Sequence, residues 1–280
     1  VPIVGWLFRH RLSLVHRHLF FPFLYAKATF GIFLLISVNV KDLTHPFLDI
    51  VFPRNCVITG DMVEEDSPYQ FLSKAVAQKL FRVEAPYCRT CGYPYFGAVM
   101  ASDRACPKCK ELDPLYGEGR TVILVEGVGR ELVHKFKYEA AGYLLQDFFT
   151  LFEKCVGLSE YLEGAQLVPV PLHPRKFRER GFNQSEALCQ ALIRLQPSAS
   201  LSKILVRTMD TPSQTLFSRK ERMRNLRNAF QLKPEAKIDK DKRYLIVDDV
   251  FTTGSTVNSC VRTLKKGGIH RIDILTLGHG

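Results

Sequence analysis

Two adjacent carboxylates, Asp248 and Asp249, stand between an apolar run and a loop of small hydroxylated residues. Residues 244–256 read Tyr-Leu-Ile-Val-Asp-Asp-Val-Phe-Thr-Thr-Gly-Ser-Thr. The N–H groups of such a loop and of a following helix bind phosphate, while neighbouring carboxylates suit ribose hydroxyls or a magnesium ion. The stretch therefore predicts a sugar-phosphate site. The alternative is an ordinary strand-to-helix turn with an aspartate N-cap.

Four cysteines form a second group with the spacing of a metal site. Cys88 and Cys91 make one pair, Cys106 and Cys109 the other, and two residues separate the members of each pair. This spacing lets both thiolates of a pair reach one tetrahedral ion, as in zinc sites. Four thiolates leave no open coordination position, so we expect a structural Zn²⁺ rather than a catalytic one. Four unrelated thiols or a redox pair are the alternatives.

Basic residues are concentrated between the cysteines and the carboxylates. Residues 171–230 contain 12 Lys and Arg against 4 Asp and Glu, in a chain of net charge +11. Such a concentration suits a diphosphate, a nucleotide or nucleic acid, and a solvated basic surface is the alternative. Arg175, Lys176, Arg178 and Arg180 follow a predicted strand in what we interpret as a basic loop. They are candidates to bind such a polyanion.

Alternating strands and helices must position these residues. Apolar runs predict strands at 121–125, 166–170, 203–207, 243–247 and 271–277. Periodic patterns predict helices at 69–81, 130–152 with a break near Gly142, 185–195, 219–229 and 255–266. This alternation indicates an α/β fold with a parallel sheet covered on both faces. Such sheets bind ligands at the carboxyl ends of their strands, where Asp248 and Asp249 fall.

The 280 residues are sufficient for one large and one small domain. We expect a hydrophobic basic extension over 1–46, a cysteine-bearing zinc-ribbon module over 47–118, and the α/β domain over 119–280. Lys27, near the middle of the apolar run 19–40, disfavours stable membrane insertion. We interpret 1–46 as unrelated to the working protein, with a membrane or export segment as the alternative. The cysteine usage favours a reducing, cytoplasmic compartment.

The chain resembles the competence protein F (ComF/GntX) family, which joins a cysteine zinc module to a type I phosphoribosyltransferase-like domain. The resemblance covers 47–280 and rests on the 244–256 motif, the two cysteine pairs and further motifs. These are Phe-Leu-Asp-Ile-Val-Phe-Pro at 47–53, Lys-Phe-Lys-Tyr at 135–138, Val-Pro-Val-Pro-Leu at 168–172, Arg-Gly-Phe-Asn-Gln at 180–184, and Gln214, Arg222, Asn225, Ala229 and Phe230. Members of the family often carry a further cysteine pair near the start of this region. Here only Cys56 of that pair is present, and Thr59 stands in place of the second cysteine, so we expect no second metal site.

The resemblance implies roles for individual residues. In that family the acidic pair holds the ribose hydroxyls of phosphoribosyl diphosphate (PRPP), with Mg²⁺, and the loop holds its 5-phosphate. Asp248, Asp249 and Arg180 are accordingly expected to be catalytic. The expected substrate-binding residues are Lys137, Arg175, Lys176, Gln214, Arg222, Asn225, Thr252, Thr253, Gly254, Ser255 and Thr256. Of these, Gln214, Arg222 and Asn225 correspond to the loop that folds over such sites and excludes water.

Three functions are compatible with these residues. The first is a magnesium-dependent phosphoribosyltransferase that uses PRPP and an unidentified nitrogen nucleophile. The second is a PRPP-responsive binding protein without turnover. The third, which the resemblance also implies, is an accessory factor in natural transformation that binds single-stranded DNA and works with competence proteins. The aromatic residues that stacking on single strands requires are few around the basic stretch.

Overall fold

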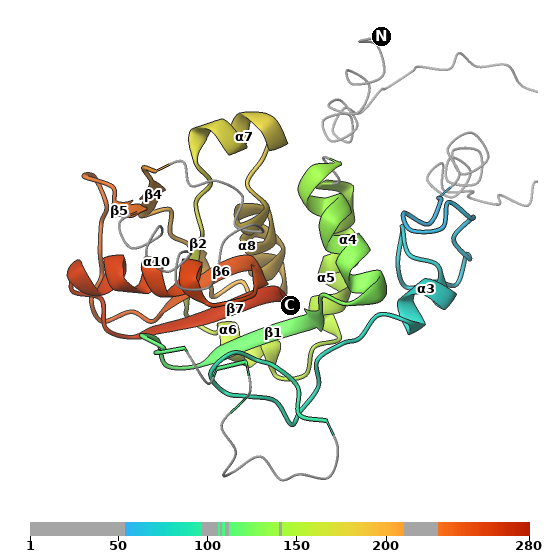
Figure 1. Ribbon diagram of the computed structural model, residues 1–280, viewed down its shortest axis with the longest axis horizontal. Helices are drawn as coiled ribbons and strands as arrows, with labels where there is room; N and C mark the ends of the chain where they lie inside the picture. Colours follow the sequence, from blue (N-terminus) through green and yellow to red (C-terminus); the bar gives the residue numbers. More distant parts are fainter. Residues whose placement is uncertain (1–53, 97–105, 107, 110–111, 140–141, 210–228) are drawn as a thin grey trace, which may run out of the picture. The chain divides into compact units, whose positions relative to one another are not determined.

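Five parallel strands in the order β1-β7-β6-β2-β3 form the centre of the protein (Figure 1). The computed structural model describes residues 54–96, 106, 108–109, 112–139, 142–209 and 229–280, which all belong to the unit Leu48–Gly280. In chain order the strands are β1 (Gly119–Leu124), β2 (Gln166–Pro169), β3 (Ser200–Leu201), β6 (Tyr244–Phe251) and β7 (Ile272–His279). The predicted parallel α/β fold is confirmed.

The central strand β6 is buried on both of its faces. Successive side chains of a strand point to opposite sides, and the residues of β6 divide accordingly. Leu245 and Val247 join one hydrophobic core, whereas Tyr244 and Ile246 join another. The continuous apolar run before Asp248 is therefore the signature of a strand covered by layers on both sides.

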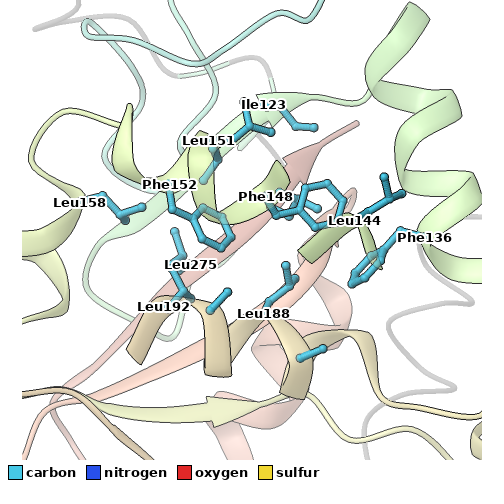
Figure 2. Close-up of a cluster of buried hydrophobic side chains, with 14 of the residues drawn as sticks. Ile123, Phe136, Leu144, Phe148, Leu151, Phe152, Leu158, Leu188, Leu192 and Leu275 are labelled. Carbon is cyan, nitrogen blue, oxygen red and sulfur yellow. The ribbon is translucent and has the colours of Figure 1, made fainter. Parts of the chain in front are cut away.

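Helices pack the first core against one face of the sheet. They are α4 (Gly127–Tyr138), α5 (Leu145–Glu153), α6 (Leu158–Leu162) and α8 (Gln184–Leu195). Figure 2 shows Phe136 of α4, Phe148 of α5 and Leu188 of α8 in this core, which also includes Leu275 of β7. The rings of Phe136 and Phe148 meet edge to face, with centroids 4.8 Å apart. The predicted break near Gly142 is confirmed, because a short 3₁₀ turn, η1 (Gly142–Leu144), comes between α4 and α5.

The second core lies under α10 (Ser255–Lys266) and includes the cysteine cluster. Cys88, Cys91 and Cys106 are buried in it together with Phe251 of β6 and Val257 of α10. The cysteine segment and the sheet therefore share one core. The knuckle of the first cysteine pair also lies against β1, where the Thr121 hydroxyl donates to the Cys91 carbonyl over 3.1 Å.

The chain reverses its direction across the sheet between β2 and β6. From β2 the connection through α8 leads outward to β3, whereas from β6 the connection through α10 leads the opposite way to β7. The two connecting helices diverge from this point, leaving a crevice at the carboxyl ends of β2 and β6. Such topological switch points are where ligands bind in open α/β sheets.

The structure differs from the sequence expectations in the basic stretch. Residues interpreted as a basic loop include a helix, α7 (Pro174–Arg180), because His173 caps its start, Pro174 occupies its first turn and Gly181 ends it with φ +79°. The predicted strand at 203–207 exists as β4 (Leu205–Arg207), but it pairs antiparallel with β5 (Phe230–Leu232) outside the main sheet. The predicted helix at 69–81 is shorter, α3 (Lys74–Gln78).

Other expectations lie outside the described residues. They are the extension 1–46 and, apart from Ala229, the predicted helix 219–229. Within the part of the chain that the structure describes, no helix is both long and apolar enough to cross a membrane.

Candidate functional site

The two aspartates near the end of β6 are held by different helices. Asp248 Oδ1 accepts hydrogen bonds from the Ser185 hydroxyl of α8 at 3.2 Å and from the backbone N–H of Asp249 at 2.9 Å. Asp249 is 9% exposed, and its Oδ1 lies 3.0 Å from Nζ of Lys137 in the last turn of α4. The structure thus brings the acidic pair and Lys137 together.

The acidic pair carries more negative charge than this site readily holds. Burial and, to a smaller extent, the neighbouring charge of Asp249 raise the pKa of Asp248 to about 7 against the opposing effect of Lys137. Negative charge that two neighbouring carboxylates share is stabilised by a cation or by hydroxyl donors. A carboxyl group perturbed in this way, in a crevice, is typical of ligand sites.

The loop after β6 turns at Gly254 into α10. Gly254 has φ +69°, and a Cβ at this position would lie 2.8 Å from Cδ1 of Leu112 and 2.9 Å from the Phe251 ring. Both the left-handed conformation and the close contacts therefore require glycine. The hydroxyls of Thr253 and Ser255 are 2.8 Å apart and fix the two sides of the turn. As the N-cap, Gly254 brings no side-chain acceptor to the first N–H groups of α10, which are donors suited to a phosphate.

Helix α7 brings two of its basic residues to the site. Lys176 and Arg180 are partly buried and four positions apart, so they lie on the same side of the helix. The Arg180 guanidinium donates to Gln184 Oε1 over 3.1 Å and lies 5.1 Å from the ring centre of Tyr138. Arg175 is exposed, and its Nε donates to Glu179 Oε1, one helical turn away, over 3.1 Å.

A cavity of about 260 Å³ joins these groups. The carboxylates come from β6, the cations from α4, α7 and β4, and hydroxyls from α8 and the start of α10. Its lining comprises Lys137, Tyr138, Val170, Leu172, Lys176, Arg180, Gln184, Ser185, Arg207, Asp248, Asp249, Val250, Thr252 and Thr256. Of the residues expected at the site, Arg175 is not in this lining, and Thr253, Gly254 and Ser255 form the turn between Thr252 and Thr256.

Four polar lining residues were not among the expected site residues: Tyr138 and Gln184, which belong to motifs of the family resemblance, and Ser185 and Arg207. The Ser185 hydroxyl donates to Asp248. The sequence feature that could have indicated Ser185 is its position directly after Asn183 and Gln184, at the start of a predicted helix. Arg207 ends β4 and is 9% exposed, but as the last residue of an apolar strand it resembled a structural arginine. Gln214, Arg222 and Asn225 lie outside the described residues, in the segment that leaves β4 and returns at β5.

The four cysteines of the two pairs form a cluster suited to a metal ion. All four Sγ atoms lie within 4.8 Å of one another, with Cys88 to Cys109 at 3.9 Å and Cys91 to Cys106 at 3.8 Å. Sulfurs at the corners of a tetrahedron around Zn²⁺, with bonds of about 2.3 Å, would be separated by about 3.8 Å. Gly92, at φ +74°, allows the tight turn after the first pair. Tyr116 adds a buried hydroxyl that has no hydrogen-bond partner among the described residues.

Comparisons with known proteins place the chain among bacterial relatives. The DNA utilization protein YhgH of Escherichia coli is 31% identical over 207 residues, which is 72% of this chain and 88% of that protein. Competence protein F of Haemophilus influenzae is 30% identical over 68% of this chain and 82% of its own length. Competence protein ComFC of Streptococcus pneumoniae is 25% identical over 61% and 74%, respectively.

The other two comparisons add less. No protein-family model matches the chain. A solved hypoxanthine phosphoribosyltransferase from Staphylococcus aureus is similar over 49% of this chain and 64% of its own, at 18% identity and a TM-score of 0.31. Family membership follows from the relatives found by sequence, which align over most of both chains at about 30% identity. The chain belongs to the competence protein F (ComF/GntX) family.

Proposed function

We propose that the cavity binds PRPP together with Mg²⁺, and that the protein is a phosphoribosyltransferase-like protein that serves DNA uptake or utilisation. One observation carries the proposal: a carboxylate pair, with Asp249 buried and Asp248 half-buried, and a glycine-turned loop at a helix N-terminus open into the same cavity. Carboxylates suit the ribose hydroxyls and the loop suits a phosphate.

The ribose end of the ligand would lie against β6. Asp248 and Asp249 would accept hydrogen bonds from the ribose hydroxyls, with Lys137 holding Asp249 in place. The 5-phosphate would bind the N–H groups and hydroxyls of 252–256 at the start of α10, whose dipole favours an anion. Thr252 and Thr256 line the cavity at this end and offer their hydroxyls.

The diphosphate end of the ligand would lie towards α7. Lys176 and Arg180 line the cavity from that helix, and Arg207 adds a third cation from β4. Cations aimed at a departing diphosphate stabilise the charge that develops on it as the bond to C1 of ribose breaks. A nitrogen nucleophile would then form the new bond to C1, and the diphosphate would leave as the second product.

Mg²⁺ would bind in addition to the protein groups that hold the ribose and the diphosphate, and it would replace none of them. The residues fit the ion, because the two neighbouring carboxylates in the cavity offer the oxygen ligands that Mg²⁺ prefers. Bound together with the substrate, the ion supplies charge neutralisation of the diphosphate. The protein residues bind and orient the sugar, and Lys176 and Arg180 balance the leaving group.

Calorimetry and a pyrophosphate assay test the proposal and separate turnover from binding alone. Titration of PRPP into the full chain with Mg²⁺ should give saturable binding, and ribose 5-phosphate should compete for the same site. Release of pyrophosphate with one of a panel of nitrogen bases would support a transferase. Binding without release for every base would favour the PRPP-responsive binding protein instead. Absence of binding at millimolar PRPP would contradict the proposed function altogether.

A second function, binding of single-stranded DNA, is favoured by aromatic residues next to the cysteine cluster. Phe96 is 58% exposed and packs against Phe81, which is 43% exposed, and against Tyr93, with ring centroids 5.4 and 6.0 Å away. Lys108 Nζ lies 5.2 Å from the Tyr93 ring centre. Exposed aromatics beside a cation suit stacking of unpaired bases. Names of relatives that refer to competence and DNA utilization agree with such a role.

The DNA-binding function has its own test. Affinity for a labelled oligothymidylate should fall several-fold in the Phe96→Ala variant and should decrease with salt. Phe177→Ala, which removes an exposed aromatic from α7, is the matched control. If both variants bind like the unaltered chain, the aromatic residues near the cysteines do not bind DNA.

We also propose that the metal of the cysteine cluster is Zn²⁺ and that it is structural. The support is a set of four sulfurs at tetrahedral separations, three of them on buried residues. Elemental analysis of the purified chain should give one zinc ion per chain, and chelation should lower the thermal transition. A chain that carries no metal, and whose transition chelators leave unchanged, would contradict this assignment. The cytoplasmic location expected from the cysteines remains part of the same proposal.

A further inference from the structure

A short segment, 112–116, connects the cysteine cluster to the proposed phosphate loop. Its first residue, Leu112, donates its backbone N–H to the carbonyl of Cys109 over 2.8 Å. The Leu112 side chain lies directly on Gly254, since a Cβ on that glycine would be 2.8 Å from Leu112 Cδ1 and 3.3 Å from Cδ2. Leu112 therefore contacts Cys109, a candidate metal ligand, through its backbone. Through its side chain it contacts Gly254, where the phosphate loop turns.

Asn258 of α10 makes a second connection at the same place. Its Oδ1 accepts the backbone N–H of Leu115 at 3.1 Å, and its Nδ2 donates to the carbonyl of Asp113 at 2.8 Å. The residue is 6% exposed, and its own backbone N–H donates to the carbonyl of Gly254 at 2.9 Å. The side chain of Asn258 thus fixes the backbone of the segment to the first turn of α10, just after the phosphate loop.

The surrounding side chains leave little freedom between the two features. Cys88, Cys91 and Cys106 pack in the same core as Phe251, which precedes the loop, and Val257, which follows it. Close-packed interiors transmit displacements rather than absorb them. The positions of Cys106 and Cys109 and the shape of the phosphate loop are therefore not independent.

We propose that the metal bound by the four cysteines holds the phosphate loop in its anion-binding shape, with Leu112 and Asn258 as the positioning residues. The metal and the phosphate ligand would then bind cooperatively, each raising the affinity for the other by the same factor. The identity of the ligand rests on the proposed function. The proposed effect of the metal on the shape of the loop does not depend on that function.

Hydrogen–deuterium exchange tests the coupling without any ligand. In the full chain, removal of zinc should speed exchange in peptides covering 250–258 by about tenfold, because the loop loses its support. Peptides from α8 should stay unchanged, since α8 packs in the first core, which does not include the four cysteines. Equal exchange at 250–258 with and without zinc would overturn the proposal.

Variants of the zinc-loaded chain keep the test decisive even if chelation unfolds the protein. Asn258→Leu removes both side-chain hydrogen bonds, and Leu112→Ala removes the contact on Gly254. Each should speed exchange at 250–258 while the zinc content remains one per chain. Thr263→Val is the matched control, because Thr263 lies on the same helix and bonds Phe230 and Ser259 instead of the segment. Unchanged exchange in both test variants would overturn the proposal.

Binding of PRPP distinguishes this inference from the function on which its ligand rests. Zinc-loaded Asn258→Leu should bind PRPP about tenfold more weakly than the unaltered chain, whereas Thr263→Val should bind it equally well. If the unaltered chain does not bind PRPP but its loop still responds to zinc, the proposed function fails and the coupling stands. If PRPP binds equally to the unaltered chain and both test variants, the positioning roles of Leu112 and Asn258 fail.

Discussion

The two sides of the cavity are built in opposite ways. On the β6 side, Asp249 and Ser185 are buried, and each contacts a charged group on another element of the fold. On the α7 side, the helix has seven residues and none is buried, although Lys176 and Arg180 face the cavity. The first side is part of the folded core, and the second is a surface helix beyond the end of the sheet (Figure 1).

Under the proposed function, this difference assigns a separate task to each side of the cavity. Groups fixed by a core hold a ligand in one geometry, which suits the ribose and its 5-phosphate. Surface cations adjust to a charged group at low cost but contribute less each, which suits a diphosphate that must leave. Substitutions on the β6 side should therefore have larger effects, on both binding and stability, than substitutions on the α7 side.

The largest effect is expected from Asp249→Asn. The change removes a carboxylate proposed to accept ribose hydroxyls and leaves Lys137 without its partner, so affinity for PRPP should fall by about 100-fold or more. Calorimetry with Mg²⁺ measures it. Glu179→Gln, which alters an exposed carboxylate on α7, is the control. If Asp249→Asn bound PRPP as tightly as Glu179→Gln does, the acidic pair would have no part in the site.

A smaller effect is expected on the α7 side, and it should depend on the face of the helix. Arg180→Ala should weaken PRPP binding by about tenfold, because Arg180 lines the cavity. Arg175→Ala should weaken it no more than about twofold, because Arg175 is exposed and pairs with Glu179. Affinity for pyrophosphate should follow the same order. Equal losses in the two variants would show that α7 acts through its net charge alone.

The pH dependence of stability tests the β6 side of the cavity without a ligand. The pKa of Asp248 is raised to about 7 in the folded protein, so its ionisation destabilises the fold as the pH rises from about 4 through 7. Asp248→Asn removes this effect. The variant should melt at a higher temperature than the unaltered chain at pH 8, and the difference should disappear near pH 4. A difference that stayed constant with pH would contradict the raised pKa.

The smallest effect is expected at the junction of the two sides. Asn183 caps α8 by accepting the backbone N–H of Ser185, and its Nδ2 donates to the carbonyl of Val170 over 3.1 Å. Asn183→Ala should lower the free energy of unfolding by about 1 kcal/mol, the usual contribution of an N-cap. Asn183→Asp keeps the cap, so denaturant unfolding of the two variants isolates it. Equal losses in both would assign the effect to the bond with Val170.

The β6 side followed from the sequence because its signals are local. An apolar run, two carboxylates and a small-residue loop predict a strand, a site and a helix start within 13 positions, and Gly254 has the conformation that the loop requires. Helix α7 also had local signals in Pro174 and Gly181, but its density of basic residues led to the prediction of a loop. Its start and end followed from ordinary helix chemistry.

Other features depend on contacts between distant segments. Ser185 and Asp248 are 63 positions apart, and the residues around each of them give no indication that the two are in contact. The antiparallel pairing of β4 with β5 joins residues on either side of 210–228, so the short apolar run at 203–207 resembled a strand of the main sheet. The contact of Leu112 with Gly254 depends on packing in the second core, which the spacing of cysteines does not encode.

A crystal structure of the chain with PRPP and Mg²⁺ tests the central claim most directly, because it reports both sides of the cavity at once. The account predicts the ribose hydroxyls on Asp248 and Asp249, the 5-phosphate on 252–256, and the diphosphate towards Lys176 and Arg180. A ligand bound away from the carboxylate pair, or with its diphosphate on the 252–256 loop, would contradict it.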